Sequence, residues 1–363
     1  MKHRFDVLDI FRGLFASMVV LFHMAFFTDT PLINNRLVRN ADMFVDFFFV
    51  LSGFVIAYSY PQFETSRKLQ RFLTRRFWRI YPLHFVMLLA VLFVELTKNS
   101  LSDYVHINQP DNPNNNVYTF LTSLLLLNSV KLFGVTDVSW NIPSWSISAE
   151  MIAYVVYGLA MRLIAPRWKA PAFLALSVGA AATLVAVTGK MELNYSFDYG
   201  FLRGLTGFFA GAFCFTLFSA AYDRVRALPG GLFSILEVLM LALIVVSISF
   251  GEALKHIGLL YEFVFLAAIF VFSFEKGICS STLKKSTLLH RVGTYSYSIY
   301  LTHPLTLSLF NILFVRILKF SPASYSYLVF LNFVVIYFVA RWTYHHIELK
   351  FKDGRLPFLS QRV

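Results

Sequence analysis

Ten apolar runs, each near the length that crosses a lipid bilayer, dominate this chain of 363 residues. A spanning helix needs about 20 apolar residues, and the bilayer core admits only helices and closed barrels because it offers the backbone no hydrogen-bonding partner. The runs cover residues 10–29, 43–60, 80–97, 145–164, 171–188, 199–221, 232–250, 257–275, 293–315 and 324–345. We predict one all-α polytopic membrane domain over residues 1–363, with a short cytoplasmic tail at 346–363.

The charges support this class of protein and predict its orientation. Charged residues make up only 14% of the chain, against about 25% in soluble domains, and the net charge of +12 falls in bursts between apolar runs. Loops that stay in the cytoplasm carry excess lysine and arginine. With ten spans, every burst and both termini lie in the cytoplasm, and residues 98–144 lie outside. The bursts contain Arg67, Lys68, Arg71, Arg75, Arg76, Arg79; Arg162, Arg167, Lys169; Arg224, Arg226; Lys276, Lys284, Lys285, Arg291; and Lys350, Lys352, Arg355, Arg362.

An eleventh, weaker apolar run at residues 118–133 is short and contains threonine, serine and asparagine. Counting it as a span would move every later basic burst to the outside. Non-helical or short segments at membrane depth are tolerated where protein covers their backbone. We therefore predict an interfacial or re-entrant helix packed on the outer side.

Two ionisable residues, Arg12 and His23, interrupt the first span. Charged groups inside spans are costly and mark candidate functional sites. Eleven helical steps return to nearly the same face about 16 Å further along, so the pair lines one track from the cytoplasmic end outward. The alternative is an arginine that reaches the interface and a histidine bonded to a backbone carbonyl.

Two acids lie at the outer depth predicted for His23. Asp46 is near the outer end of the second span, where it either orients the imidazole or caps the helix start. Glu150 is one turn inside the fourth span, with Ser146 and Tyr154 four residues away on the same face. A buried acid needs a partner, and His23 is the candidate.

An arginine cluster, Arg75, Arg76 and Arg79, precedes the third span together with Tyr81. Arginine binds phosphate through two parallel hydrogen bonds and stacks on planar rings. The cluster therefore suits a multiply charged phosphate ligand, although anchoring by the positive-inside rule explains it equally well.

Two further polar residues interrupt later spans. Arg203 lies among small residues in the sixth span, which indicates a close helix contact or room for a ligand. His303 precedes Pro304 in a stripe with Ser296 and Tyr297, and fits a site or a helix kink.

Six of these segments, in this order, resemble the acyltransferase-3 family of integral membrane acyltransferases. Two departures are Ile10 and Phe11, where the family usually reads LDGLRG, and Met151, where many members carry an acid. The matching blocks are LDIFRGLFASMVVLFH with Arg12 and His23, VDFFFVLSGFVIA, RRFWRIYP with Arg76 and Arg79, PSWSISAE ending at Glu150, GFLRGLTGFFAG with Arg203, and SYSIYLTHP ending at His303.

The resemblance implies ten spans, a cytoplasmic acyl-CoA donor without a metal, and O-acylation of a glycan at the outer face of a bacterial inner membrane. Many members carry a fused secreted hydrolase-like domain. Here we expect the stand-alone form, which either completes the transfer itself or passes the acyl group to a polysaccharide-assembly partner.

The expected mechanism assigns a role to each candidate residue. Arg75, Arg76 and Arg79 hold the phosphates of acetyl-CoA, and the pantetheine arm follows the track from Arg12 to His23. The imidazole of His23 is a base or a transient acyl carrier, oriented by Asp46 or Glu150. The remaining substrate-binding candidates are Tyr81, Ser146, Tyr154, Arg203 and His303.

Two other functions remain open at this stage. One is a membrane carrier for a glycan or lipid-linked sugar, and the other is a non-enzymatic sensor or scaffold. Succinyl is the alternative to acetyl, since Arg203 offers a cation for a second carboxylate.

Overall fold

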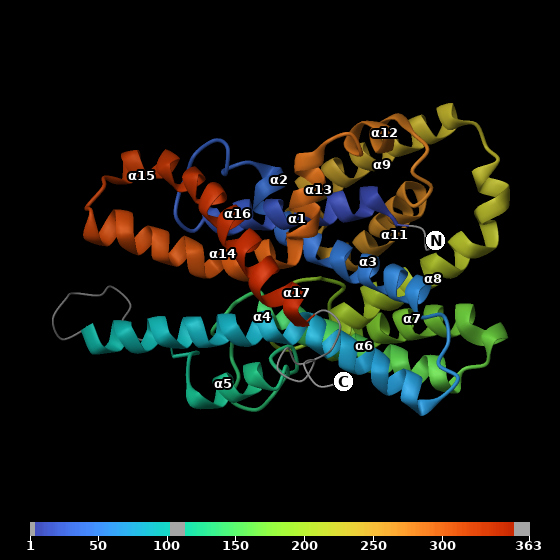
Figure 1. Ribbon diagram of the computed structural model, residues 1–363, viewed down its shortest axis with the longest axis horizontal. Helices are drawn as coiled ribbons and strands as arrows, with labels where there is room; N and C mark the ends of the chain where they lie inside the picture. The colour runs from blue at the N-terminus through green and yellow to red at the C-terminus, as the bar shows by residue number, and fades with distance from the viewer. Residues whose placement is uncertain (1–3, 102–112, 352–363) are drawn as a thin grey trace.

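The computed structural model describes residues 4–101 and 113–351, and these residues form helices and connecting turns without a β-strand (Figure 1). Within these two described stretches, ten helical segments are long and apolar enough to cross a membrane. The prediction of an all-α protein with ten spans is confirmed. The spanning segments are Asp6–Met24, Ala41–Ser59, Ser66–Lys98, Ser144–Leu163, Pro166–Thr188, Gly200–Arg226, Gly230–Ser249, Gly251–Phe272, Ser296–Ile317 and Ala323–Phe351.

Shorter helices connect or interrupt these segments, and two π-helical turns, Ile312–Ile317 and Tyr344–Glu348, continue the last two spans. The α-helices are α1 Asp6–Met24, α2 Arg36–Arg39, α3 Phe44–Ser59, α4 Ser66–Leu101, α5 Val117–Leu124, α6 Ser144–Leu163, α7 Lys169–Thr188, α8 Gly200–Arg226, α9 Gly230–Ser249, α10 Gly251–Leu254, α11 Tyr261–Phe272, α12 Ile278–Leu283, α13 Thr287–Thr294, α14 Ser296–Asn311, α15 Pro322–Leu328, α16 Asn332–Thr343 and α17 Leu349–Phe351.

Hydrogen bonds between loops bring the N-terminus and several basic connections to one end of the bundle. The Lys276 ammonium donates to the carbonyls of Arg226 and Leu228, which joins the loop after α11 to the loop after α8. The same loop after α11 accepts the backbone N–H of Val7 at the Glu275 carboxylate. The start of the first span, the end of α8 and the loop after α11 therefore lie on the same side of the bundle, as the predicted orientation requires.

Helix α8 packs against α3, α6 and α7 and is central to the bundle. Its contact with α3 depends on two glycines, one on each helix, and each glycine lies against the backbone of the other helix. A Cβ on Gly53 would overlap the carbonyl oxygen of Phe208, and a Cβ on Gly211 would overlap that of Val50. Small residues allow membrane helices to approach this closely.

Helices α1 and α14 run side by side in the same direction. Arg12 of α1 donates to Ser296 of α14. Further toward the C-terminal end of both helices, His23 Nδ1 lies 3.2 Å from His303 Nε2. This pairing fixes which polar side chains of the first and ninth spans share a surface.

The weak run at 118–133 does not span. Only Val117–Leu124 is helical, and its eight residues are too few to cross a bilayer. The chain then turns back along neighbouring helices: His84 of α4 bonds to the carbonyl of Ser123, and Ser148 of α6 donates to that of Leu126. These contacts cover the short segment with protein, as the prediction of an interfacial or re-entrant helix required.

The predicted tail at 346–363 needs a correction at its start. The last helical segment continues to Phe351, and Glu348 within it is buried against Arg79 and Ser298. Apolar periodicity ends before this stretch, so the sequence does not reveal that it packs. Residues 352–363, with their lysine and arginines, lie outside the described residues.

Candidate active site

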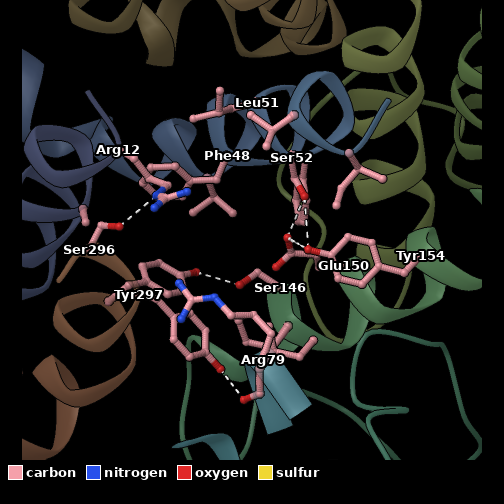
Figure 2. A pocket seen from close by; sticks show the side chains of 18 of the residues that line it. Arg12, Phe48, Leu51, Ser52, Arg79, Ser146, Glu150, Tyr154, Ser296 and Tyr297 are labelled. Carbon is pink, nitrogen blue, oxygen red and sulfur yellow. Dashed lines mark hydrogen bonds between the residues drawn. The ribbon is translucent and has the colours of Figure 1, made fainter. Parts of the chain in front are cut away.

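A cavity of about 150 Å³ lies between α1, α3, α4, α6 and α14 (Figure 2). It is built from a cationic group of side chains, a half-buried carboxylate with its hydroxyl partners, and aromatic walls. Its polar lining consists of Arg12, Ser52, Arg76, Arg79, Ser146, Glu150, Tyr154, Ser296, Tyr297 and Tyr300.

Three arginines supply the positive charge of the cavity. Arg12 donates through Nε to Ser296 at 2.9 Å, and Arg79 pairs with the buried carboxylate of Glu348. Arg76 donates to the Tyr60 hydroxyl at 3.0 Å, while its buried Nε has no hydrogen-bond partner among the described residues. A buried guanidinium N–H without a partner is a donor available to a ligand.

Tyr60 reports the strength of this positive field from just outside the spans. Burial raises the pKa of its hydroxyl, but the charge and hydrogen bond of Arg76, joined by Arg75, outweigh burial and bring the pKa below its ordinary value. The inner part of the cavity therefore favours anions.

Glu150 provides a half-buried carboxylate. Its Oε1 accepts hydrogen bonds from Ser52 at 2.7 Å and from Tyr154 at 2.5 Å, and the Arg76 guanidinium lies 5.9 Å from the centre of the Tyr154 ring. Figure 2 shows Ser52, Glu150 and Tyr154 pointing toward one another. The structure brings Glu150 to these hydroxyls and to the cavity, and its hydrogen bonds go to them rather than to His23.

His23 and His303 form a pair beyond the described lining of the cavity. His23 Nδ1 lies 2.9 Å from the Val19 carbonyl and 3.2 Å from His303 Nε2, and His303 Nδ1 lies 2.7 Å from the Tyr300 carbonyl. A carbonyl only accepts, so in the neutral rings both Nδ1 atoms carry the hydrogen. His23 then donates to His303 Nε2, and its own Nε2 carries a lone pair.

Asp46 pairs with Arg203 instead of His23. Its two carboxylate oxygens accept from Arg203 Nε and Nη2, both at 2.7 Å, and both side chains are buried. The guanidinium also lies 5.1 Å from the centre of the Trp145 ring. A buried guanidinium requires such a two-point partner, so the predicted role of Asp46 in orienting His23 is replaced here by the Val19 carbonyl and His303.

A family model described as an acyltransferase domain matches residues 5–345 of the chain. The chain belongs to the acyltransferase-3 family. It is 30% identical over 195 residues to "Protein 2 in picA locus" from Rhizobium radiobacter, which covers 50% of this chain and 94% of that protein. It is 34% identical over 121 residues to "Acyltransferase MdmB" from Streptomyces mycarofaciens, covering 33% of this chain and 28% of that protein. No solved structure matches.

The site residues predicted from the sequence contribute unequally to the cavity. Arg12, Arg76, Arg79, Ser146, Glu150 and Tyr154 line it. Arg203 is not among the described residues of its lining, and Arg75 is exposed on α4. Tyr81 donates to the Leu124 carbonyl and secures the segment after α5. Of the twelve predicted site residues, four besides the histidine pair therefore lie around the cavity and outside its described lining: Asp46, Arg75, Tyr81 and Arg203.

The sequence analysis missed several residues of the cavity. Ser52 is a single polar residue in an apolar run, and Tyr300 lies in the polar stripe before His303, which were the available signals. Glu348, the partner of Arg79, lies beyond the apolar period in a stretch read as tail. Its partner lies 269 residues away in the chain, and no pattern in a single sequence reports such a pairing.

Proposed function

We propose that this acyltransferase transfers an acetyl group from cytoplasmic acetyl-CoA to a hydroxyl of an exported or cell-surface glycan, in the inner membrane of a bacterium. The observation that carries the proposal is one cavity lined by three arginines and by Tyr300, whose ring centre lies 6.0 Å from that of His303. The cationic part suits the phosphates of coenzyme A, and the histidine pair suits the chemistry.

The reaction needs a base for the acceptor hydroxyl. His23 Nε2 takes the hydroxyl proton while the oxygen attacks the thioester carbon, the carbon–sulfur bond breaks, and the leaving thiolate of coenzyme A takes the proton from His23. The Val19 carbonyl, which accepts from His23 Nδ1, fixes the tautomer that leaves Nε2 unprotonated, and His303 Nε2 lies beside the same Nδ1. In the two-step route, His23 instead carries the acyl group and water is excluded until the acceptor arrives.

Acetyl is preferred over succinyl in this proposal for one reason. A succinyl group brings a carboxylate, and the cation suggested for it, Arg203, is already bound at both ends of its guanidinium fork by Asp46. A buried carboxylate without a partner is costly. An uncharged acyl group avoids that cost.

The test is mass spectrometry of the surface glycans from cells with the protein, without it, and with His23→Ala. We expect a glycan acetyl group that disappears without the protein and in His23→Ala at equal protein amounts. His346→Ala, which removes an exposed histidine, is the matched control and should keep the acetyl group. Acetylation that survives in His23→Ala would contradict the assigned base, and unchanged acetylation with altered glycan export would favour the carrier.

A further inference from the structure

Tyr300 of α14 lines the cavity and neighbours His303, and Phe48 of α3 and Ser146 of α6 line the cavity and contact Tyr300; we call these three residues the wall. Tyr300 lines the cavity, and its ring centre lies 6.0 Å from that of His303. Its ring also meets Phe48 edge to face at 5.9 Å. Tyr300 thus touches the cavity on one side and the histidine pair on the other.

The wall is fixed in place by hydrogen bonds. Ser146 Oγ donates to the Pro143 carbonyl at 2.9 Å and lies 3.0 Å from the Tyr300 hydroxyl. Since the serine hydrogen is already used, the tyrosine hydroxyl donates to Ser146. Only 6% of Tyr300 is exposed, so its ring does not swing freely into solvent.

The direction in which acyl-CoA enters makes this wall important. In acyl-CoA the phosphates are at one end and the acyl group is at the other. When the phosphates are held by Arg12, Arg76 and Arg79, the acyl group is the leading end and reaches the aromatic wall first. Every group delivered to His23 therefore has to fit at Phe48 and Tyr300.

We propose that Tyr300, with Phe48 and Ser146, selects the acyl group by size, so that acetyl reaches the histidine pair and longer chains are stopped at the wall. This inference rests on the proposed function, because it assumes that an acyl thioester is the ligand of the cavity. Interiors pack too tightly to absorb added methylenes, so a longer acyl chain displaces the wall at a cost.

The experiment is a competition in membrane vesicles from cells that make the protein and its glycan. The vesicles receive an equimolar mixture of acetyl-, propionyl- and butyryl-CoA, each with a different isotope label, and the labels in the glycan are measured. The ratio of products gives the ratio of kcat/KM values and does not depend on the amount of protein. We compare wild type with Tyr300→Ala, Tyr300→Leu, Phe48→Leu and Tyr300→Phe.

Wild type should transfer acetyl, and Tyr300→Ala should raise the butyryl-to-acetyl ratio by about tenfold or more, the usual effect of space for a methylene. Tyr300→Leu and Phe48→Leu shift the ratio in the same direction and serve if the alanine variant fails to accumulate. Tyr300→Phe keeps the ring and should keep the ratio. Phe310→Leu, a buried residue of the same helix outside the described lining, is the matched control.

Two results would overturn the inference, and they differ. Transfer of acetyl with the same product ratio in wild type, Tyr300→Leu and Phe48→Leu removes the size filter and leaves the proposed function intact. Vesicles with wild-type protein that incorporate none of the three labels reject the proposed function and the filter together.

Discussion

Among the described residues, the two buried acids nearest Arg203 differ in their hydrogen-bond partners. Asp46 and Arg203 satisfy each other through two hydrogen bonds at the interface of α3 and α8. Glu262 of α11 is buried near the same pair, yet neither of its carboxylate oxygens has a hydrogen-bond partner among the residues described. The Asp46–Arg203 pair therefore stabilises the packing of α3 on α8, whereas the Glu262 carboxyl group contributes no hydrogen bond to the fold among the described residues.

These two acids should respond differently to neutralisation. Asp46→Asn leaves a buried guanidinium without its counter-charge, a change that costs about 3–5 kcal/mol, and should lower the melting temperature of the detergent-purified protein sharply. Glu262→Gln replaces a buried carboxyl group whose oxygens have no hydrogen-bond partner among the described residues, and should keep or raise the melting temperature. Equal losses of melting temperature in the two variants would contradict this division.

At the residue scale, the sequence indicates depth along the membrane but not the neighbour of a side chain. Arg12 and Glu150 line one cavity, whereas the sequence places Arg12 at the inner end of the first span and Glu150 beside His23 at the outer depth. The partner of Asp46 was not predictable, because His23 and Arg203 are both at suitable depths and only the packing of α3 on α8 decides between them. The same limit hid the bond between His23 and His303.

Most spanning helices begin and end near the ends of the apolar runs in the sequence, and helix α4 is an informative exception. Helix α4 covers Ser66–Leu101, whereas the apolar run predicts a span only at 80–97. At about 1.5 Å per residue, 36 residues extend well beyond the bilayer core. The basic first part is not apolar, but it is helical and delivers Arg76 and Arg79 to the cavity.

The close contact of α3 and α8 predicts the effect of adding one methyl group. Gly211→Ala forces a Cβ onto the Val50 carbonyl and should destabilise the protein by about 1–3 kcal/mol, typical of overpacking. The matched control is Gly179→Ala on an open face of α7, where a Cβ meets nothing within 4 Å. Melting temperatures in detergent test both, and a Gly211→Ala protein as stable as Gly179→Ala would contradict the packing.

The whole molecule places the basic connections at one end of the bundle. In Figure 1 the N-terminus and the turn between α8 and α9 lie toward the right, and α5 and α15 lie toward the left. The positive-inside rule assigns the basic end to the cytoplasm. Under the proposed function, the arginines of the cavity then face the compartment that supplies the acyl-CoA donor.

Cysteine labelling tests this orientation. In a variant with Cys214 and Cys279 replaced, a cysteine at Asn115 should react with an impermeant thiol reagent added to intact spheroplasts, and one at Lys285 only after permeabilisation. The wild-type cysteines, which lie in α8 and α12, are replaced so that only the new cysteine can react. Reaction of both new cysteines from the same side would contradict the ten-span orientation.

The central claim is that the arginine-lined cavity binds acyl-CoA and that His23 acts on it afterwards. The most direct measurement is acetyl-CoA affinity of purified wild type, Arg76→Ala, His23→Ala and Arg71→Ala at one ionic strength. We predict that Arg76→Ala weakens binding about 10- to 150-fold, the loss of a charge-assisted phosphate contact worth about 1.5–3 kcal/mol. His23→Ala and the exposed control Arg71→Ala should bind as wild type does. Equal affinity in Arg76→Ala and Arg71→Ala would show that these arginines only anchor the protein at the membrane surface, and would contradict the account.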